Sequence, residues 1–137
     1  MKRKAKLKSY TFSVSRRKSC SARVRIFKGD GVSLVNGKAI EEYFCDPLSK
    51  KRWLLPFQLT ETEGKYYITV KIKGGGKAGQ IDAVVTGIAK ALSKVSDGKY
   101  RKVLKKAGLL TTDSRVRERR KVGTGGKARR KKQSPKR

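Results

Sequence analysis

Apolar and polar residues alternate with a period of two near the start of the chain, which predicts two strands. The first, at residues 10–14, alternates polar residues with Tyr10, Phe12 and Val14, as in a strand half buried against a core. The second, at residues 22–27, has apolar residues on one face and Arg23 and Arg25 on the other. Together they predict a sheet with a cationic side, with a merely solvated side as the alternative.

Turn sequences and a further alternation extend the predicted sheet. Residues 28–31 and the pair Asn36-Gly37 are strong turn signals, and they bound a short third strand at residues 32–35. The clearest strand is residues 66–73, where apolar and polar side chains alternate throughout. Between these strands we expect a short helical turn at residues 39–44 and a basic loop at residues 46–56.

A 3.6-residue period follows the glycine-rich segment at residues 74–80 and predicts an amphipathic helix. Its apolar stripe consists of Ile81, Val84, Val85, Ile88, Leu92 and Val95. Residues 100–110 predict a second, Lys-rich helix, and apolar periodicity ends after Leu110. We therefore expect a basic extension at residues 1–9, a globular α+β domain at 10–110 and an extended basic tail at 111–137. The lone Trp53 could stack on a nucleobase, but its apolar neighbours favour the core.

Charge narrows the possible functions. The 137 residues include 38 Lys and Arg, 10 Asp and Glu and no His, for a net charge of +28. Residues 1–28 have eleven basic side chains and no acidic one, and residues 111–137 have twelve basic and two acidic ones. Most of the excess charge therefore lies near the two ends. Such concentration indicates extended contact with a polyanion, of which nucleic acid is the simplest example.

Other site chemistries find little support in the residue types. Cys20 and Cys45 have no CxxC spacing and no His beside them, so they cannot supply the about four ligands of structural zinc. We expect them to be reduced, packing cysteines. The basic N-terminus lacks the apolar region of a signal peptide, and no apolar stretch approaches the ~20 residues that span a bilayer. Without His or a thiol–base pair, acid–base catalysis is disfavoured.

The glycine-rich segment resembles a phosphate loop only in part. Lys77 is followed by Ala78 rather than by the hydroxyl residue of a Walker motif. Gly74, Gly76 and Gly79 match GxGxxG, but the expected acidic partner at a strand end is missing. Two interpretations stay open and are compatible: a tight strand-to-helix turn, and a close approach of a nucleic-acid backbone to the glycines and the helix start.

The order of several motifs resembles one family closely, the universal ninth protein of the small ribosomal subunit. The matching segments are Arg16-Arg17-Lys18-Ser19, Ala22-Arg23-Val24-Arg25, Val35-Asn36-Gly37-Lys38, Glu42-Tyr43-Phe44, Gly74-Gly75-Gly76, Gly79-Gln80, Gly87-Ile88-Ala89, Ala91-Leu92, Leu104-Lys105-Lys106-Ala107-Gly108-Leu109-Leu110-Thr111, Asp113, Arg115, Glu118-Arg119-Arg120-Lys121 and the terminal Lys136-Arg137. The resemblance covers nearly the whole chain from Tyr10. The Leu-Leu-Thr form is more similar to bacterial or organellar members than to archaeal or cytosolic eukaryotic ones.

The resemblance implies an α+β fold with a four-stranded sheet and helices on one side, like the second domain of the fifth small-subunit protein. It implies a non-enzymatic ribosomal component without cofactor, metal, membrane or small-molecule substrate, in a cytoplasmic or, alternatively, an organellar ribosome. The implied partners are the 3′ domain of a 16S-type rRNA in the subunit head, neighbouring head proteins and the peptidyl-site tRNA. The tRNA contact maps to Lys136 and Arg137.

We expect rRNA contacts from the basic and glycine residues of these motifs and from the tail. They are Arg16, Arg17, Lys18, Arg23, Arg25, Gly74, Gly75, Gly76, Lys77, Arg115, Arg119, Arg120, Lys121, Lys127, Arg129 and Arg130. The chain departs from the family pattern in several places. Ser13-Val14-Ser15 replaces the usual Gly-Thr-Gly, Thr112 a common Arg, and Val122 a common Tyr. Near the end, Ser134-Pro135 stands where Phe-Ser is usual, which removes an aromatic ring and a backbone N–H.

Overall fold

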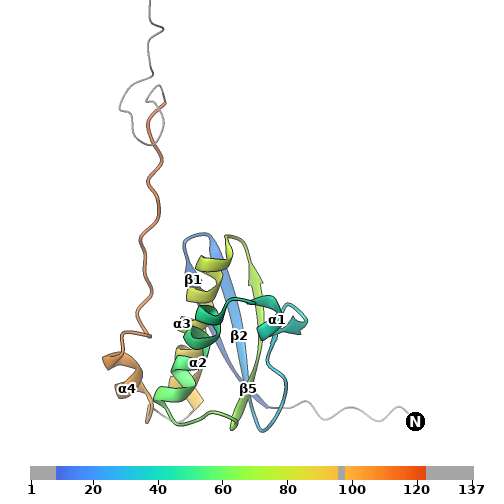
Figure 1. The fold of residues 1–137 in the computed structure, drawn as a ribbon. Helices are drawn as coiled ribbons and strands as arrows, with labels where there is room; N and C mark the ends of the chain where they lie inside the picture. Colours follow the sequence, from blue (N-terminus) through green and yellow to red (C-terminus); the bar gives the residue numbers. More distant parts are fainter. Residues whose placement is uncertain (1–8, 96–97, 123–137) are drawn as a thin grey trace, which may run out of the picture.

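The computed structural model describes residues 9–95 and 98–122, in which five strands form one mixed sheet and the helices pack on one side of it (Figure 1). The strands are β1 (Tyr10–Arg17), β2 (Cys20–Lys28), β3 (Leu34–Val35), β4 (Lys38–Ala39) and β5 (Tyr66–Lys73). The helices are α1 (Ile40–Tyr43), α2 (Pro47–Leu59), α3 (Lys77–Val95) and α4 (Arg101–Lys106). After α4 the described chain continues as an extended segment.

The strand order is β1-β2-β5-β3-β4. The long strands β1, β2 and β5 are antiparallel, whereas the short β3 lies parallel to β5. The expected α+β class with helices on one side is confirmed. The sheet has one strand more than the four expected, because the Asn36-Gly37 turn folds the chain back and pairs β4 with β3. Both turn residues have positive φ, as the tightest hairpin turns require.

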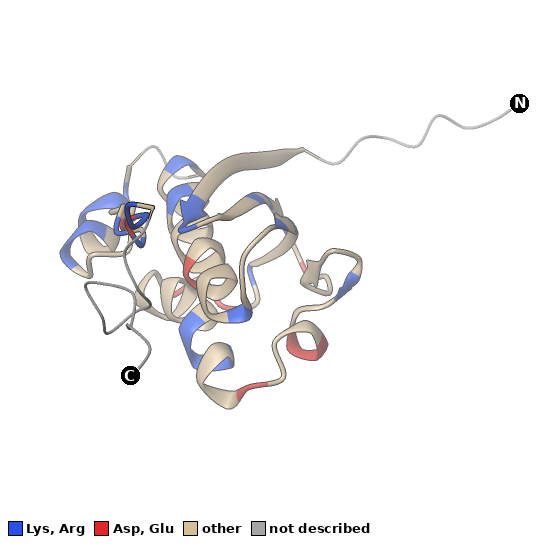
Figure 2. Cartoon of the chain, turned by 90° about the horizontal axis from the view of Figure 1, so that it is seen from above, with Lys and Arg blue, Asp and Glu red and all other residues tan. Residues whose placement is uncertain are grey.

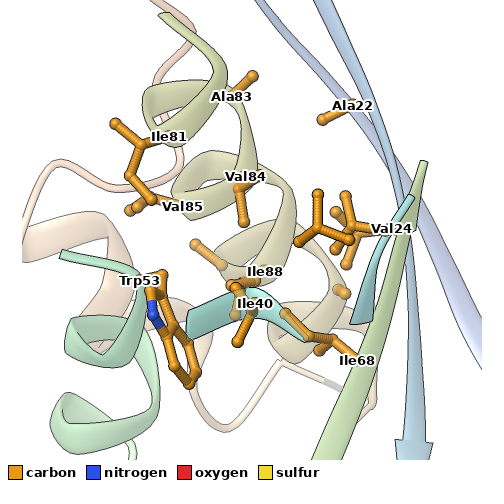
Figure 3. Close-up of a cluster of buried hydrophobic side chains, with 14 of the residues drawn as sticks. Ala22, Val24, Ile40, Trp53, Ile68, Ile81, Ala83, Val84, Val85 and Ile88 are labelled. Atoms are coloured by element: carbon orange, nitrogen blue, oxygen red, sulfur yellow. The ribbon is translucent and has the colours of Figure 1, made fainter. Parts of the chain in front are cut away.

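The core lies between the sheet and α3, with α2 packed on the other side of α3 (Figure 3). The predicted inner face of β2 is confirmed, since Ala22, Val24 and Ile26 are buried. The helical stripe is confirmed too, because all its members are buried except Val95, which packs against the core from its edge. Trp53 belongs to this core at 7% exposure, and its ring meets Phe57 edge-on.

The face of strand β1 that lies against the helices is the opposite of the predicted one. Ser13 and Ser15 are buried, whereas Phe12 and Val14 are more than 40% exposed on the opposite face. The cause is the close approach of α3, which presents Gly87 and Ala83 to this strand. A Cβ at Gly87 would lie 2.5 Å from a methyl of Val24 and 2.9 Å from Ser15 Oγ, so only small side chains fit between α3 and the sheet here.

The loop expected at residues 46–56 is wrong, because these residues lie mostly in α2. Asp46 caps this helix by accepting a hydrogen bond from Ser49 N at 3.2 Å, and Pro47 occupies its first turn, where no N–H is needed. A 3.6-residue stripe is missing because Leu48, Leu55 and Leu59 are exposed. The local signal that indicates this helix is its Asp46-Pro47 cap, not a hydrophobic period.

Two other elements are shorter than predicted. Strand β3 begins at Leu34, since Val32 is exposed and precedes the pairing with β5. Helix α4 ends at Lys106, and Gly108 follows it with a φ of 72°, a left-handed cap that glycine allows. Leu109 N then donates to Leu104 O at 3.1 Å and closes the helix end.

Candidate nucleic-acid interface

The face of the sheet opposite the helices is cationic and carries no acidic side chain in its three long strands. The alternation confirmed in β2 and β5 points Arg23 and Arg25 outward together with Lys71 and Lys73. Arg23 lies directly opposite Lys71 in the antiparallel register. Like charges at facing positions repel one another. This pair therefore favours an anion between or above the two side chains.

A shallow groove of about 880 Å³ crosses this face beside the turn between β3 and β4. It is lined by Ser21, Arg23, Asn36, Gly37, Thr69, Val70, Lys71, Ile72 and Lys73. The side-chain amide of Asn36 fixes the turn to β5, because Oδ1 accepts from Ile72 N at 2.9 Å and Nδ2 donates to Ile72 O at 3.1 Å. The groove thus combines a rigid wall with three cationic side chains, which suits a phosphate-bearing polymer.

An aromatic row occupies the other end of the same face. Phe27 and Tyr67 stack with ring centroids 5.0 Å apart. On the side of Phe27 away from Tyr67, the Tyr10 ring centroid lies 5.5 Å from that of Phe27. The guanidinium of Arg25 lies 5.0 Å from the centre of the Tyr10 ring. Phe12 is exposed on the same strand face as Tyr10. The outer face therefore offers apolar rings at one end and positive charge at the other.

The basic turn between β1 and β2 divides its three cations between two environments. Arg16 and Lys18 are exposed. Arg17 is only 14% exposed, because β1 directs it toward α3. Its Nη1 donates to Arg115 O at 2.8 Å, and its Nη2 lies 3.3 Å from Asp113 Oδ2. The structure therefore brings together Arg17 and Arg115 from the predicted set, while the RNA contact predicted for Arg17 stays a prediction.

The glycine segment before α3 is a tight turn packed on the hairpin of β1 and β2. Gly74 and Gly75 have positive φ, and a Cβ at Gly75 would overlap the sulfur of Cys20. A Cβ at Gly74 would lie 2.6 Å from Ser19 O. Around Gly76 nothing lies within 4 Å of such a Cβ. The first two glycines thus have a packing role, and Gly76 is the one that leaves room for an approaching backbone.

Lys77, at the start of α3, is directed toward α1. Its ammonium donates to Tyr43 O at 2.7 Å and lies 3.5 Å from the centre of the Tyr43 ring. Tyr43 OH in turn donates to Gln80 Oε1 at 3.0 Å, and Gln80 Nε2 donates to Gly74 O at 3.2 Å. These contacts join α1, the glycine segment and the start of α3. The RNA contact predicted for Lys77 stays a prediction.

The tail is described as far as residue 122 and runs past the end of the domain that holds the β1–β2 turn (Figure 1). Arg119, Arg120 and Lys121 are exposed along it. Figure 2 shows Lys and Arg on most described elements and acidic residues on a few short segments. Five predicted contact residues lie outside the described part of the chain: Lys127, Arg129, Arg130, Lys136 and Arg137.

The described part of the chain contains no metal-binding cluster, no membrane-spanning helix and no paired cysteines. Residues 9–95 and 98–122 contain no cluster of three or more His, Cys, Asp or Glu that could hold a metal ion. No helix within those ranges is long and apolar enough to cross a bilayer. Cys20 and Cys45 are both free thiols, and Cys20 is buried as expected. Cys45 is exposed, which corrects the expectation that both pack inside.

Sequence reasoning missed several residues of the outer face. Lys71, Lys73, Asn36 and Gly37 belong to a predicted strand and a predicted turn but not to the predicted contact residues. The alternation in residues 66–73 already placed the two lysines on one face. What it could not show is that β5 pairs with β2, which sets Lys71 against Arg23.

Comparisons with known proteins agree with this picture. Residues 15–137 match the family model described as ribosomal protein S9/S16. The chain is 46% identical over 115 residues to the small ribosomal subunit protein uS9 of Dehalococcoides mccartyi, covering 84% of this chain and 86% of the relative. It is 45% identical over 119 residues to the protein of the same name from Maridesulfovibrio salexigens, covering 87% and 91%. The uS9 of Tropheryma whipplei is 46% identical over 110 residues, 80% of this chain and 71% of the relative.

Proposed function

This chain belongs to the ribosomal protein S9/S16 family, structural components of the small ribosomal subunit, and from that premise we propose that it binds a 16S-type rRNA in the subunit head. The observation that carries the proposal is the outer face of the sheet, where Arg23 and Lys71 oppose each other and no acidic residue stands in the long strands. Phosphates of a folded RNA would relieve that repulsion.

We propose that the globular part and the tail contribute to RNA binding in different ways. The globular part, residues 10–110, provides the fixed outer face and the exposed cations of the β1–β2 turn. The tail, residues 111–137, follows the RNA with Arg115, Arg119, Arg120 and Lys121 and with the later cations Lys127, Arg129 and Arg130. Phosphates of the RNA would neutralise the charge of this chain of basic residues. Neighbouring head proteins are further partners, and the role is structural rather than enzymatic.

We further propose that Lys136 and Arg137 reach the peptidyl-site tRNA. The support is the family resemblance of the chain end, and both residues lie outside the described part of the structure. Deleting the two residues should weaken tRNA binding at the peptidyl site without reducing the yield of assembled subunits. If tRNA affinity is unchanged in purified subunits, the terminal residues have no such role. The cellular location is the ribosome, and an organellar ribosome is the alternative to a bacterial one.

The rRNA proposal is tested by the salt dependence of binding. Full-length protein is titrated onto a transcript of the 3′ domain of 16S rRNA at several salt concentrations. The double variant Arg23→Ala/Lys71→Ala should reduce the slope of log K against log salt by about 1.4 to 1.8, the contribution of two phosphate contacts. The matched control is Lys50→Ala/Lys65→Ala, which removes the same charge from side chains engaged by Glu41 Oε1 at 2.8 Å and Glu61 O at 3.0 Å. Equal slopes for the two double variants would exclude the outer face as the contact surface.

A further inference from the structure

The first residues of the tail are bound to the domain by a polar cluster centred on Arg17. Its guanidinium contacts Arg115 O and Asp113 Oδ2, as described above, and its Nε lies 3.7 Å from Asp82 Oδ2. Asp82 belongs to α3 and also pairs with Arg52 of α2. The Arg17 side chain therefore joins the end of β1, helix α3 and the tail while largely shielded from solvent, and Asp82 links this cluster to α2 through Arg52.

Within the tail, Asp113 and Arg115 bind each other. Arg115 grips the carboxylate of Asp113 with two side-chain nitrogens, Nε at 3.0 Å from Oδ1 and Nη2 at 2.7 Å from Oδ2. The backbone N–H of Arg115 also donates to Asp113 Oδ1 at 2.9 Å. This compact turn presents Asp113 Oδ2 and Arg115 O to Arg17. A planar guanidinium can meet both acceptors at once, whereas an ammonium is a single point charge on a flexible stem.

A second contact aligns the tail along α3. Lys90 Nζ donates to Thr112 Oγ1 at 2.9 Å. Lys90 and Asp82 are eight residues apart in α3, a rise of about 12 Å. Because the tail passes Lys90 before it reaches the Arg17 and Asp82 cluster, it runs antiparallel to α3 and leaves beside the β1–β2 turn (Figure 1). The exposed cations Arg16 and Lys18 lie at this end.

We propose that Arg17 is a positioning residue that sets the direction in which the basic tail leaves the domain. The inference rests on the proposed function for its purpose, because a directed tail matters only if the tail has a target. Ordering a free chain opposes binding because each residue loses backbone freedom. Contacts that hold residues 112–115 before RNA is met remove part of that penalty. Arg17 thus acts on RNA binding through the tail rather than by touching phosphate itself.

The orientation is measured on the full-length free protein by electron spin resonance between two spin labels. One label is attached to the exposed thiol of Cys45 and the other to Arg117→Cys, while Cys20 stays buried. The parent should give one narrow distance distribution. Arg17→Ala and Arg17→Lys should each broaden it at least twofold. The matched control Arg16→Ala removes an equal charge from the neighbouring, exposed position and should leave the width unchanged.

An unchanged width in Arg17→Ala would overturn the proposal, and so would equal broadening in Arg16→Ala. Should Arg17→Ala fail to fold, which circular dichroism would show, Asp113→Asn tests the same contact from its partly exposed side and must broaden the distribution. In reconstituted subunits, Arg17→Ala should lower peptidyl-site tRNA affinity at least threefold. Because the distance measurement needs no RNA, broadening without a tRNA effect would reject the proposed tail function and keep the positioning role.

Discussion

The hydroxyl of Ser13 donates a hydrogen bond to the carbonyl oxygen of Gly87 at 2.6 Å and so ties edge strand β1 to α3. Ser15 makes the equivalent bond to Ala83 O one turn earlier in the helix. The hydroxyls of both serines are buried and satisfied by helix carbonyls, so this chain gains two cross-element bonds without opening the close contact between helix and sheet.

Removing the Ser13 hydroxyl should weaken the fold measurably. We expect Ser13→Ala to lower the free energy of unfolding by about 0.5–1.5 kcal/mol, the net value of one hydrogen bond. Urea unfolding of the full-length protein measures this difference. The half-exposed Ser21 on the outer face is the control, and Ser21→Ala should stay within about 0.5 kcal/mol of the parent. A loss of the same size at both positions would mean that the bond to Gly87 contributes nothing.

The absence of a side chain at Gly87 should matter more than its poor helix propensity. Gly87→Ala improves helix propensity by ~1 kcal/mol, yet its methyl would meet a Val24 methyl at 2.5 Å. Overpacking of this kind typically costs about 1–3 kcal/mol. We therefore expect a net loss of unfolding free energy. Combining it with Val24→Ala should give a favourable coupling energy in a double-mutant cycle, and additive effects would show that the two sites do not touch.

Substitutions at Gly75 and Gly76 distinguish the two interpretations of the glycine segment, a tight turn and a close approach of an RNA backbone. Gly75→Ala should destabilise the protein strongly, because φ is 65° and the new methyl would overlap Cys20 Sγ. Gly76→Ala should change the unfolding free energy by less than about 0.5 kcal/mol, since open space surrounds that position. If Gly76→Ala nevertheless weakens rRNA binding, Gly76 is where RNA approaches. Equal stability of the two variants would contradict the packing role of Gly75.

Asn36 combines a backbone requirement with two side-chain bonds, and two substitutions separate them. Asn36→Gly keeps the left-handed backbone conformation but loses both bonds to Ile72, for an expected loss of about 1–3 kcal/mol. Asn36→Ala loses the bonds and also meets the unfavourable φ of 51°, which adds roughly 1–2 kcal/mol. Thermal unfolding should rank the parent above Gly and Gly above Ala. The reverse order of the two variants would show that φ is not strained here.

The carboxyl of Asp113 reports on the contacts at the start of the tail. The side-chain hydrogen bond from Arg115 lowers the pKa of Asp113 well below its ordinary value, and the backbone hydrogen bond from Arg115 adds to this. A lowered pKa means that the contribution of the carboxylate is complete above about pH 4 and is lost only as the pH falls through the lowered value. Carbon NMR should therefore show Asp113 ionised throughout pH 4–8. Arg115→Ala should return the titration toward its usual range, and a normal pKa in the parent would contradict the cluster.

Strong local patterns were enough to predict the central elements. Strands β2 and β5 and helix α3 follow from alternation and from the 3.6-residue stripe, because these periods are local properties of the backbone. The same patterns placed Arg23 and Arg25 on one face, and the structure confirms that placement. The ordered series of short motifs also predicted the family, which the comparisons show independently.

Helix α2 marks a limit of such patterns. Its buried residues Trp53 and Phe57 lie four positions apart, but exposed leucines between and around them hide the stripe. The sequence Asp46-Pro47 fits both the start of a loop and a capped helix start, and the structure has the helix. The additional strand β4 has only two residues, too few for any periodicity to detect.

The sequence by itself determined that β1 alternates, that the family is ribosomal and that positive charge dominates both ends of the chain. Only the tertiary structure decided which face of β1 meets α3, because that depends on how closely Gly87 lets the helix approach. This choice of face sends Arg16 outward and Arg17 toward Asp82 and Asp113, residues distant in sequence. Two adjacent arginines that look equivalent as cations thereby acquire different surroundings, since a side chain's partners depend on long-range packing and not on its local pattern.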